Sequence, residues 1–155
     1  MQKVNQTTVQ DLLEVFDHPS SALYRAIELR QIYEGCKDLN FETPSLDIGC
    51  GDGKIASVLF STKFTCGVYN GEAKDYQVAI EKNRYGKVLL ESAEKMSLPD
   101  KSVNFVFSNS VLEHIPDLDA VFKEISRVLT DGGYLVFTAP TKYFKQYRWP
   151  RPQTY

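Results

Sequence analysis

The spacing of apolar residues near the start of the chain predicts two helices. Four apolar residues fall at positions i, i+3, i+4 and i+7 of one helical face: Val9, Leu12, Leu13 and Phe16. Pro19 interrupts this pattern and suits the first turn of a second helix, which we expect to run to about residue 34 and to stop at Gly35. The apolar residues that we expect to face inward from the second helix are Leu23, Ala26 and Ile27.

From residue 45 onward, short apolar runs alternate with amphipathic segments. The runs that we expect to be strands cover residues 45–48, 64–69, 88–90, 103–107 and 134–139. Helices are expected over residues 54–61 and 72–83, and a last helix ends at Asp131-Gly132-Gly133. The apolar stripe of that last helix is Leu118, Val121, Phe122, Ile125, Val128 and Leu129. Repeated strand–helix units predict an α/β fold with a Rossmann-like, doubly wound, mostly parallel sheet that binds ligands at the carboxyl ends of its strands.

The segment after the first expected strand predicts a tight loop that leads into a helix. It reads D-I-G-C-G-D-G-K from Asp47 to Lys54. Glycine residues allow positive φ and close approach of a ligand to the backbone, and the helix N-terminus offers free N–H groups, so a nucleoside-type cofactor fits. The dinucleotide fingerprint G-x-G-x-x-G is not met, because Gly53 comes one residue early. The phosphate-binding motif G-x-x-x-x-G-K-[ST] is also missing, and a tight turn without a ligand is the alternative.

Length and composition indicate one globular domain spanning residues 1–155. Apolar residues make up 43% and charged residues 25%, and a net charge of −2 does not favour binding to nucleic acid. The sequence shows no apolar run long enough to span a membrane and no secretory signal. Cys36, Cys50 and Cys66 form no C-x-x-C pair, so we expect a reducing, cytoplasmic location. The two histidines are far apart without clustered acids, so no metal site is expected.

Four segments resemble motifs of the class I S-adenosylmethionine (SAM)-dependent methyltransferases. Residues 47–53 resemble their motif I, and residues 93–107 resemble the exit of the third strand together with the fourth strand. Residues 108–115 resemble the segment that follows, and residues 127–135 resemble the R-V-L-x-x-G-G-x-L passage into strand five. The resemblance covers about residues 45–140 and is to the type 11 group of small-molecule methyltransferases. It implies SAM as cofactor, S-adenosylhomocysteine (SAH) as product, and a five-stranded sheet of order 3-2-1-4-5 behind N-terminal helices in residues 1–44.

The resemblance also implies roles for individual residues in cofactor binding. The residues whose backbone would pack against the methionine part of SAM are Gly49, Cys50, Gly51, Asp52 and Gly53. Asp47 would accept hydrogen bonds from the cofactor's ammonium group, or would cap the amides of the loop. Ser108 and Asn109 would line the methionine end. Cys50 would serve as a small side chain rather than as a nucleophile, because no activating base is near it in the sequence.

Residues near the acceptor are the candidates for catalysis. His114, which follows the fourth strand, is the candidate general base, and its neighbour Glu113 is the weaker one. A base is needed only if the acceptor is a hydroxyl or a protonated amine; otherwise His114 is a structural residue. Tyr24 and Arg25 in the N-terminal helices are candidates for contact with the acceptor, because related enzymes often cover the acceptor with such helices.

The chain departs from the family's pattern at two acidic positions. The acid that grips the ribose hydroxyls is replaced by Tyr69, which could stack beside the adenine, and Asn70 could offer an amide to the ribose. A second acid, which faces the adenine amino group, is replaced by Ser92, just before Ala93. Each lost hydrogen bond to a charged partner costs about 1.5–3 kcal/mol, so the sequence predicts weaker SAM binding than is typical.

The chain also departs from the family after its fifth strand. Residues 141–155 are rich in basic and aromatic residues, and the segment after residue 139 is too short for the helix and two further strands that the family fold adds. We therefore expect a truncated form or fragment, or an exposed strand edge that pairs with a second copy to form a homodimer. The tail is read either as a lid or contact surface or as a linker.

Taken together, the sequence predicts a SAM-dependent methyltransferase whose acceptor is a small molecule, a lipid or a glycan precursor. The alternative is a degenerate domain that keeps the fold and serves as a binding or assembly module. The acids missing at Tyr69 and Ser92 and the short segment after the fifth strand favour it. A nicotinamide-dependent oxidoreductase is disfavoured by the early third glycine and the missing ribose acid.

Overall fold

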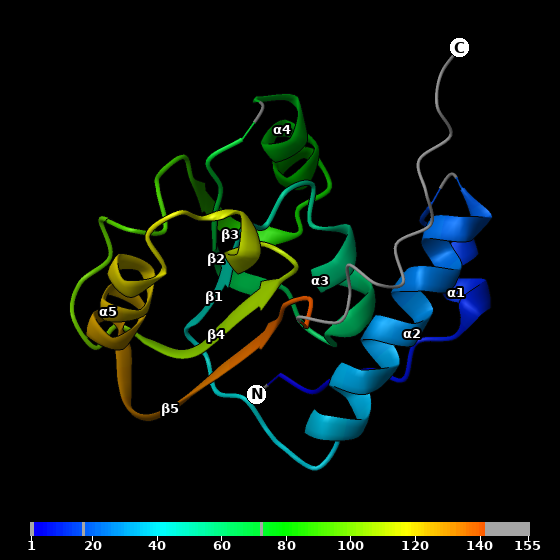
Figure 1. Cartoon of the computed structure of the whole chain (residues 1–155), viewed down its shortest axis with the longest axis horizontal. Coiled ribbons are helices and arrows are strands. Elements are labelled where there is room, and N and C mark those ends of the chain that lie inside the picture. The colour runs from blue at the N-terminus through cyan, green and yellow to red at the C-terminus, as the bar shows by residue number, and fades with distance from the viewer. Residues whose placement is uncertain (1, 17, 72, 142–155) are drawn as a thin grey trace.

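A computed structural model describes residues 2–16, 18–71 and 73–141 of the chain (Figure 1). The elements are α1 (Val9–Leu13), α2 (Pro19–Cys36), β1 (Ser45–Ile48), α3 (Lys54–Leu59), β2 (Phe64–Val68), α4 (Ala73–Glu81), β3 (Tyr85–Leu89), β4 (Val103–Asn109), η1 (Leu112–His114), α5 (Leu118–Val128) and β5 (Leu129–Thr138). The five strands form one sheet of order β3-β2-β1-β4-β5 in which every neighbouring pair is parallel. The predicted fold and strand order are confirmed. Of the predicted tail, Thr141 alone lies inside the described residues.

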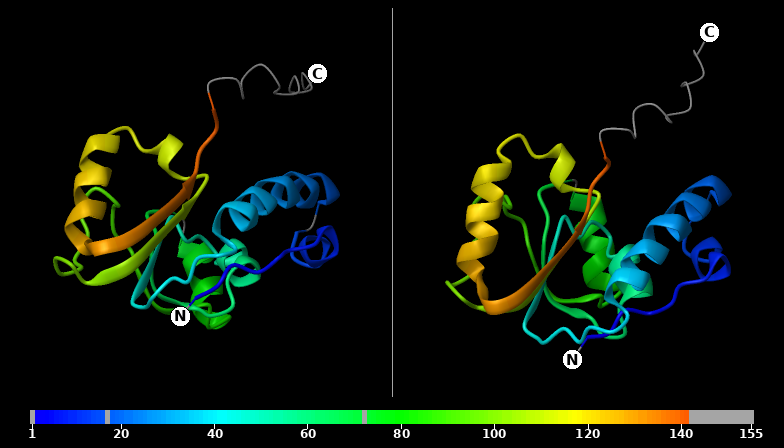
Figure 2. Two further views of the ribbon diagram at one scale, coloured as in Figure 1. Left: turned by 90° about the horizontal axis from the view of Figure 1, so that it is seen from below. Right: turned by 60° about the horizontal axis from the view of Figure 1, so that its bottom comes forward.

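Helices cover both faces of the sheet, as a doubly wound fold requires (Figure 2). One face packs against α2, α3 and α4 through an aromatic core: Phe41, Phe60, Phe64, Phe105 and Phe107. The rings of Phe41 and Phe105 stack with their centroids 4.1 Å apart. The other face packs against α5 and includes Leu46 and Ile48 of β1. Because neighbouring side chains of a strand point to opposite faces, β1 presents Asp47, which lies between these two residues, on the face covered by α2 and α3.

The N-terminal helices differ from their predicted form. Helix α1 begins with a capping box between Thr8 and Asp11 and ends at Leu13, three residues before the end of the predicted apolar stripe. Helix α2 buries Ala22, Leu29, Ile32 and Cys36. The prediction that Leu23 and Ile27 face inward is wrong, since their side chains are 56% and 63% exposed. The helix turns its other stripe to the sheet because that stripe carries Arg25 and Glu28, which hydrogen-bond to residues at the carboxyl ends of strands.

Two strands also begin earlier than the apolar runs indicate. Strand β3 begins at Tyr85 rather than at residue 88. The apolar run did not indicate this start because β3 lies at the edge of the sheet and its early positions, Gly86 and Lys87, are exposed. Strand β5 begins at Leu129, directly after α5, rather than after the Asp131-Gly132-Gly133 segment. Leu129 pairs with Val103 and Tyr134 with Phe105, so this segment is accommodated as an irregularity within the strand rather than as the end of the helix.

The apolar stripe of α5 is buried in part. Val121, Ile125 and Val128 are buried against the sheet, whereas Leu118 and Phe122 are each 39% exposed. The Phe122 ring meets the Phe137 ring of β5 edge-on, with the centroids 6.0 Å apart. The remaining element boundaries agree with the predicted ones to within two residues. The loops that carry the predicted site therefore leave the carboxyl ends of the strands as expected.

Candidate functional site

The loop that joins β1 to α3, residues 49–53, is the centre of the candidate site and is called the glycine loop here. Gly49, Gly51 and Gly53 all have positive φ, at 75°, 50° and 76°. Other residues rarely adopt this conformation, so the loop depends on glycine. A Cβ on Gly49 would also overlap the Val111 side chain, with Val111 Cγ1 at 2.6 Å, whereas a Cβ on Gly51 would meet nothing within 4 Å. Gly51 therefore leaves the backbone open on the side where a ligand could approach.

Two cavities lie on either side of Val111, which lines both of them. The first, called the β2 cavity, has a volume of about 310 Å³ and reaches the ends of β2 and β3. The second, called the α2 cavity, has a volume of about 340 Å³ and reaches Arg25 of α2. Gly49 lines both cavities, so the glycine loop connects them. An elongated ligand that spans both cavities would therefore pass over the glycine loop.

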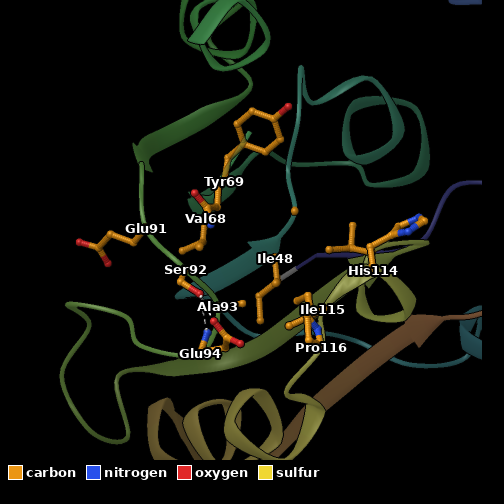
Figure 3. A pocket seen from close by; sticks show the side chains of 13 residues that line it. Ile48, Val68, Tyr69, Glu91, Ser92, Ala93, Glu94, His114, Ile115 and Pro116 are labelled. Carbon is orange, nitrogen blue, oxygen red and sulfur yellow. Dashed lines mark hydrogen bonds between the residues drawn. The ribbon is translucent and has the colours of Figure 1, made fainter. Parts of the chain in front are cut away.

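The β2 cavity brings together five of the residues predicted from the sequence: Tyr69, Asn70, Ser92, Ala93 and His114. Figure 3 shows the Tyr69 ring directed away from Ser92, and the hydroxyl of Tyr69 donates a hydrogen bond of 2.7 Å to Asp75 Oδ2. The exposed side chain of His114 lies across the cavity from Ser92 (Figure 3). His114 ends the short helix η1, and its backbone N–H donates to the Val111 carbonyl.

Two acids that the sequence reasoning missed also line the β2 cavity. Glu91 and Glu94 flank Ser92, and the Ser92 hydroxyl donates a 2.8 Å hydrogen bond to Glu94 Oε2. Glu91 points away from Ile48 in Figure 3, and its carboxylate accepts a 2.7 Å bond from the Ser97 backbone N–H. The sequence did offer a signal, because both acids stand within two residues of the position where an acid is missing.

The α2 cavity brings together the predicted residues Asp47, Gly49, Cys50, Gly51, Asp52 and Asn109, with Arg25 opposite them on α2. Asp47 is buried, and its Oδ2 accepts a 2.6 Å hydrogen bond from the Tyr85 hydroxyl. Burial raises the pKa of Asp47 to about 7, and the bond from Tyr85 acts in the opposite direction. Burial also raises the pKa of the Cys50 thiol well above its usual range, so this thiol stays protonated and is a poor nucleophile.

A hydrogen-bonded cluster around Glu28 was also missed by the sequence reasoning. Glu28 Oε1 accepts bonds from Asn109 Nδ2 at 2.8 Å, from the Ser110 hydroxyl at 2.7 Å and from the Thr138 hydroxyl at 2.9 Å. Its other oxygen pairs with Arg25, which also donates to Asn109 Oδ1 at 3.1 Å. Burial alone would raise the pKa of Glu28, but bonds from Ser110, Arg25 and Thr138 hold it below the usual value. The cluster fastens α2 to the carboxyl ends of β4 and β5.

Four of the residues predicted for the site or the acceptor line neither cavity: Tyr24, Gly53, Ser108 and Glu113. Gly53 is buried at the start of α3, where a Cβ would lie 2.7 Å from Tyr85 Cε2 and 2.9 Å from Arg84 Cδ. Ser108 is buried in β4, and its hydroxyl donates a 3.1 Å bond to the Ile48 carbonyl. Gly53 and Ser108 thus pack against or bond to neighbouring parts of the site. Within residues 2–16, 18–71 and 73–141, no helix could cross a membrane, and no group of three acids, histidines or cysteines could hold a metal.

The chemistry of the two cavities is different. The α2 cavity presents a buried carboxylate, an arginine and open loop backbone, which together suit the zwitterionic end of an amino acid. The β2 cavity presents an amide, a hydroxyl and carboxylates around apolar residues such as Ile48, Val68 and Ile115, which suits a flat ring with hydroxyl and amino donors. One ligand that carries both ends would match the whole site.

Comparison with known proteins gives consistent matches. The model of the methyltransferase domain family matches residues 46–137, more than half of the chain. A sterol 24-C-methyltransferase of Neurospora crassa is 30% identical over 125 residues, which cover 74% of this chain and 32% of that protein. The chain thus spans about a third of the length of this curated relative.

Solved structures share the fold. A SAM-dependent methyltransferase of Thermotoga maritima superposes with a TM-score of 0.57 and 25% identity, over 80% of this chain and 59% of that one. The [4+2]-cyclase SpnF superposes with a TM-score of 0.61 and 20% identity, over 79% of this chain and 47% of that one. At that identity the second match shows a shared fold and nothing about activity.

Proposed function

The chain belongs to the methyltransferase domain family, and on this premise we propose that it binds SAM and transfers its methyl group to a small-molecule, lipid or glycan-precursor acceptor. The observation that carries the proposal is the glycine loop between two cavities of complementary chemistry. The loop takes its positive φ angles at three glycines and leaves Gly51 open toward solvent space. Residues 45–140 hold the cofactor in this proposal, and residues 1–44 cover the acceptor side within the same domain.

The α2 cavity fits the amino-acid end of SAM. Asp47 would accept a hydrogen bond from the ammonium group, and Arg25 would face the carboxylate. Arg25 is held in place by Glu28 and Asn109, so its guanidinium reaches the cavity with little freedom left to lose on binding. Backbone N–H groups of the loop would complete the contacts, because the helix behind them offers a partial positive charge.

The β2 cavity fits the nucleoside end. Asn70, Ser92 and Ala93 line it as the family resemblance implies. The acid missing at Ser92 has a neighbour that carries the same charge, since Glu94 lines the same cavity and accepts a hydrogen bond from the Ser92 hydroxyl. We propose that Glu94, whose carboxylate already holds the Ser92 hydroxyl, takes over part of the role of the missing acid. The proposed compensation favours an active site over a degenerate one.

When bound, SAM supplies a methyl group that its sulfonium has already activated. The residues of this chain contribute position and exclusion of water, and such positioning can be worth about 7–11 kcal/mol of the barrier. Glu28 fixes Asn109 and Ser110 at the carboxyl end of β4, where both residues line the α2 cavity. The next residue, Val111, lies between the two cavities. His114 is proposed to accept a proton from a hydroxyl or ammonium acceptor, because its imidazole stands exposed at the rim of the β2 cavity.

The acceptor is proposed as a class rather than as a compound. The curated relative in Neurospora crassa is named as a sterol methyltransferase, which supports an apolar or lipid acceptor within the proposed class. A homodimer through the edge of the sheet stays a prediction: within the described residues β5 pairs with β4 alone and exposes Tyr134 and Phe137.

Calorimetric titration of the purified chain with SAH tests the proposal. We expect saturable one-to-one binding, and the isosteric variant Asp47→Asn should bind SAH at least about tenfold more weakly. Methylthioadenosine, which lacks the amino-acid end, serves as the matched ligand and should bind both proteins equally. A folded wild-type chain that does not bind SAH at millimolar concentration would overturn the proposal.

The missing acids at Tyr69 and Ser92 favour a second candidate, a domain that keeps the fold as a binding or assembly module. The same titration separates the two. If the chain is such a module, the wild-type protein should not bind SAH. The variant Tyr69→Asp, which restores the ribose acid, should then bind SAH with measurable affinity. Ordinary SAH affinity in the wild type that falls in Tyr69→Asp would exclude the module.

A further inference from the structure

Tyr85 of β3 reaches across β2 to Asp47 of β1, beneath the glycine loop. It stands at the start of β3 with its ring buried, and its hydroxyl lies 2.6 Å from Asp47 Oδ2 on β1 and 3.4 Å from the Cys50 carbonyl oxygen. A phenol has one proton to donate, and the shorter contact with the carboxylate is the stronger bond. Tyr85 therefore donates a hydrogen bond to Asp47, although Tyr85 lies outside the motifs that indicated a cofactor site.

The residue between them on β2 is a glycine, and this makes the contact possible. A Cβ on Gly67 would lie 3.2 Å from Tyr85 Cδ1 and 2.7 Å from Cys50 Sγ. A side chain at position 67 would thus push against both the tyrosine ring and the loop. The absence of a side chain leaves the passage through which the tyrosine hydroxyl reaches Asp47, two strands away.

The preceding residue supports the same loop. Arg84 Nη1 donates a 2.7 Å hydrogen bond to the Asp52 carbonyl oxygen. Both side chains also lie against Gly53, where a Cβ would come within 2.9 Å of each. Two consecutive residues at the edge of the sheet therefore hold the glycine loop from beneath, while its upper side faces the α2 cavity.

We propose that Tyr85 is a positioning residue for the cofactor, which fixes the Asp47 carboxylate and sets the pH range in which the cofactor's ammonium group binds. This inference rests on the proposed function, because it takes SAM and SAH as the ligands of the α2 cavity. Tyr85 does not touch the cavity and acts through Asp47.

The surroundings of Asp47 explain why one hydroxyl matters. Tyr85 from β3 contacts Asp47 directly, and the other titratable and charged groups that line the α2 cavity with it are Cys50 and Asp52 from the loop, Arg25 from α2 and Lys54 from α3. Arg25 is paired with Glu28, and Lys54 is paired with Asp52 at 3.2 Å. The Cys50 thiol is neutral because burial raises its pKa. Among the described side chains, Tyr85 is the one whose hydrogen bond lowers the pKa of Asp47.

The sign of the pH effect follows from this arrangement. Burial brings the pKa of Asp47 to about 7, and the ammonium group binds the ionised carboxylate. Below that pH the free protein holds a proton that binding must release, so SAH affinity should fall by about tenfold per pH unit as the pH decreases. Without the Tyr85 hydroxyl the pKa rises further, and the fall should begin at a pH about one unit higher or more.

The experiment is a calorimetric titration with SAH between about pH 6 and about pH 8, in pairs of buffers of different ionisation enthalpy. The proteins are the wild type, Tyr85→Phe, which keeps the buried ring, and the control Tyr134→Phe, whose ring lies on β5 against Phe41 with centroids 5.5 Å apart. Methylthioadenosine is the control ligand, because it has no ammonium group. The buffer pairs count the protons released on binding.

We expect Tyr85→Phe to release more protons than the wild type near neutral pH and to shift the SAH affinity profile upward in pH, while Tyr134→Phe matches the wild type. Methylthioadenosine should show a flat profile in all three proteins. A Tyr85→Phe profile that is merely weaker by a constant factor, with proton release unchanged, would overturn the inference and leave the proposed function standing. If the wild type binds no SAH at any pH, both the inference and the proposed function are overturned. If Tyr85→Phe does not fold, the number of protons that the wild type releases on binding SAH decides. No proton release below pH 7 overturns the inference, and release supports it.

Discussion

Replacing Glu28 with glutamine tests whether the cluster at the ends of β4 and β5 stabilises the fold. The Glu28 side chain is 12% exposed, and one of its carboxylate oxygens accepts three side-chain bonds while the other pairs with Arg25. Glutamine has nearly the same shape and keeps one acceptor oxygen. It loses the negative charge and turns an amide N–H₂ toward the guanidinium, so the variant isolates the contribution of the charge.

The expected magnitude follows from the number and kind of bonds affected. A hydrogen bond to a charged group contributes about 1.5–3 kcal/mol, and bonds in one cluster are not additive. The neutral bonds from Ser110 and Thr138 can still form to the glutamine oxygen, so we expect a loss of about 2 kcal/mol. For a domain of this size that corresponds to a decrease in Tm of about 4–8 °C.

The assay is urea unfolding of wild type and Glu28→Gln at neutral pH and at acidic pH. The pKa of Glu28 lies below its usual value in the folded protein, so the stabilisation is present above the usual value near 4.5 and is lost as the pH falls through the lowered folded value. The two proteins should therefore differ at pH 7 and converge in acid. Glu34→Gln is the control on the same helix, since Glu34 forms an exposed pair with Lys37 and its removal should leave the free energy of unfolding unchanged. Equal stability at pH 7, or a difference that persists in acid, would refute the reasoning.

Three further substitutions separate the parts of the site. Arg25→Met should weaken the binding of SAH by about tenfold and leave the binding of methylthioadenosine unchanged. The control is Arg30→Met, which replaces an exposed arginine of the same helix. Equal losses of affinity for both ligands in calorimetry would contradict the assignment of Arg25 to the amino-acid end. Glu94→Gln should instead weaken both ligands by a similar factor of several-fold, because Glu94 lines the β2 cavity; an effect on SAH alone would argue against it. Gly49→Ala should destabilise the fold by about 1–3 kcal/mol, since the residue needs positive φ and a Cβ would overlap Val111. Adding Val111→Ala should recover part of that loss in thermal unfolding, and no recovery would show that backbone strain alone accounts for it.

The glycine loop could be predicted because its signal is local, whereas the strand order was implied by the family resemblance. A short apolar run, an acid and three closely spaced glycines fix a strand, a turn and the start of a helix within ten residues. The buried face of α2 could not be predicted in the same way. Its sheet-facing stripe includes Arg25 and Glu28, so hydrophobic periodicity pointed to Leu23 and Ile27, which are exposed. In the sequence alone, charged residues that hydrogen-bond to the ends of strands cannot be distinguished from charged residues that face solvent.

The support for the loop was also beyond the reach of sequence reasoning. Tyr85 lies 38 residues from Asp47 along the chain, and Glu28 lies 110 residues from Thr138. Neither pair has a spacing that a motif could record, because both contacts form only when the sheet aligns its strands. The start of β3 was missed for a related reason, since an edge strand exposes residues such as Lys87 and interrupts the apolar run.

The two kinds of departure from the family pattern should not weigh equally in judging whether a site still works. A glycine of the loop is constrained by backbone conformation and by space: Gly49 combines positive φ with contact to Val111, and a replacement cannot be supplied from elsewhere. An acid that meets a ligand's hydroxyl or amino group is constrained only in where its carboxylate lies. A neighbouring position of a loop can bring a carboxylate to the same cavity, as Glu94 does beside Ser92. The intact glycines of this chain therefore count for more than its missing acids, and loss of cofactor binding is expected from a change in the loop sooner than from a change at its rim.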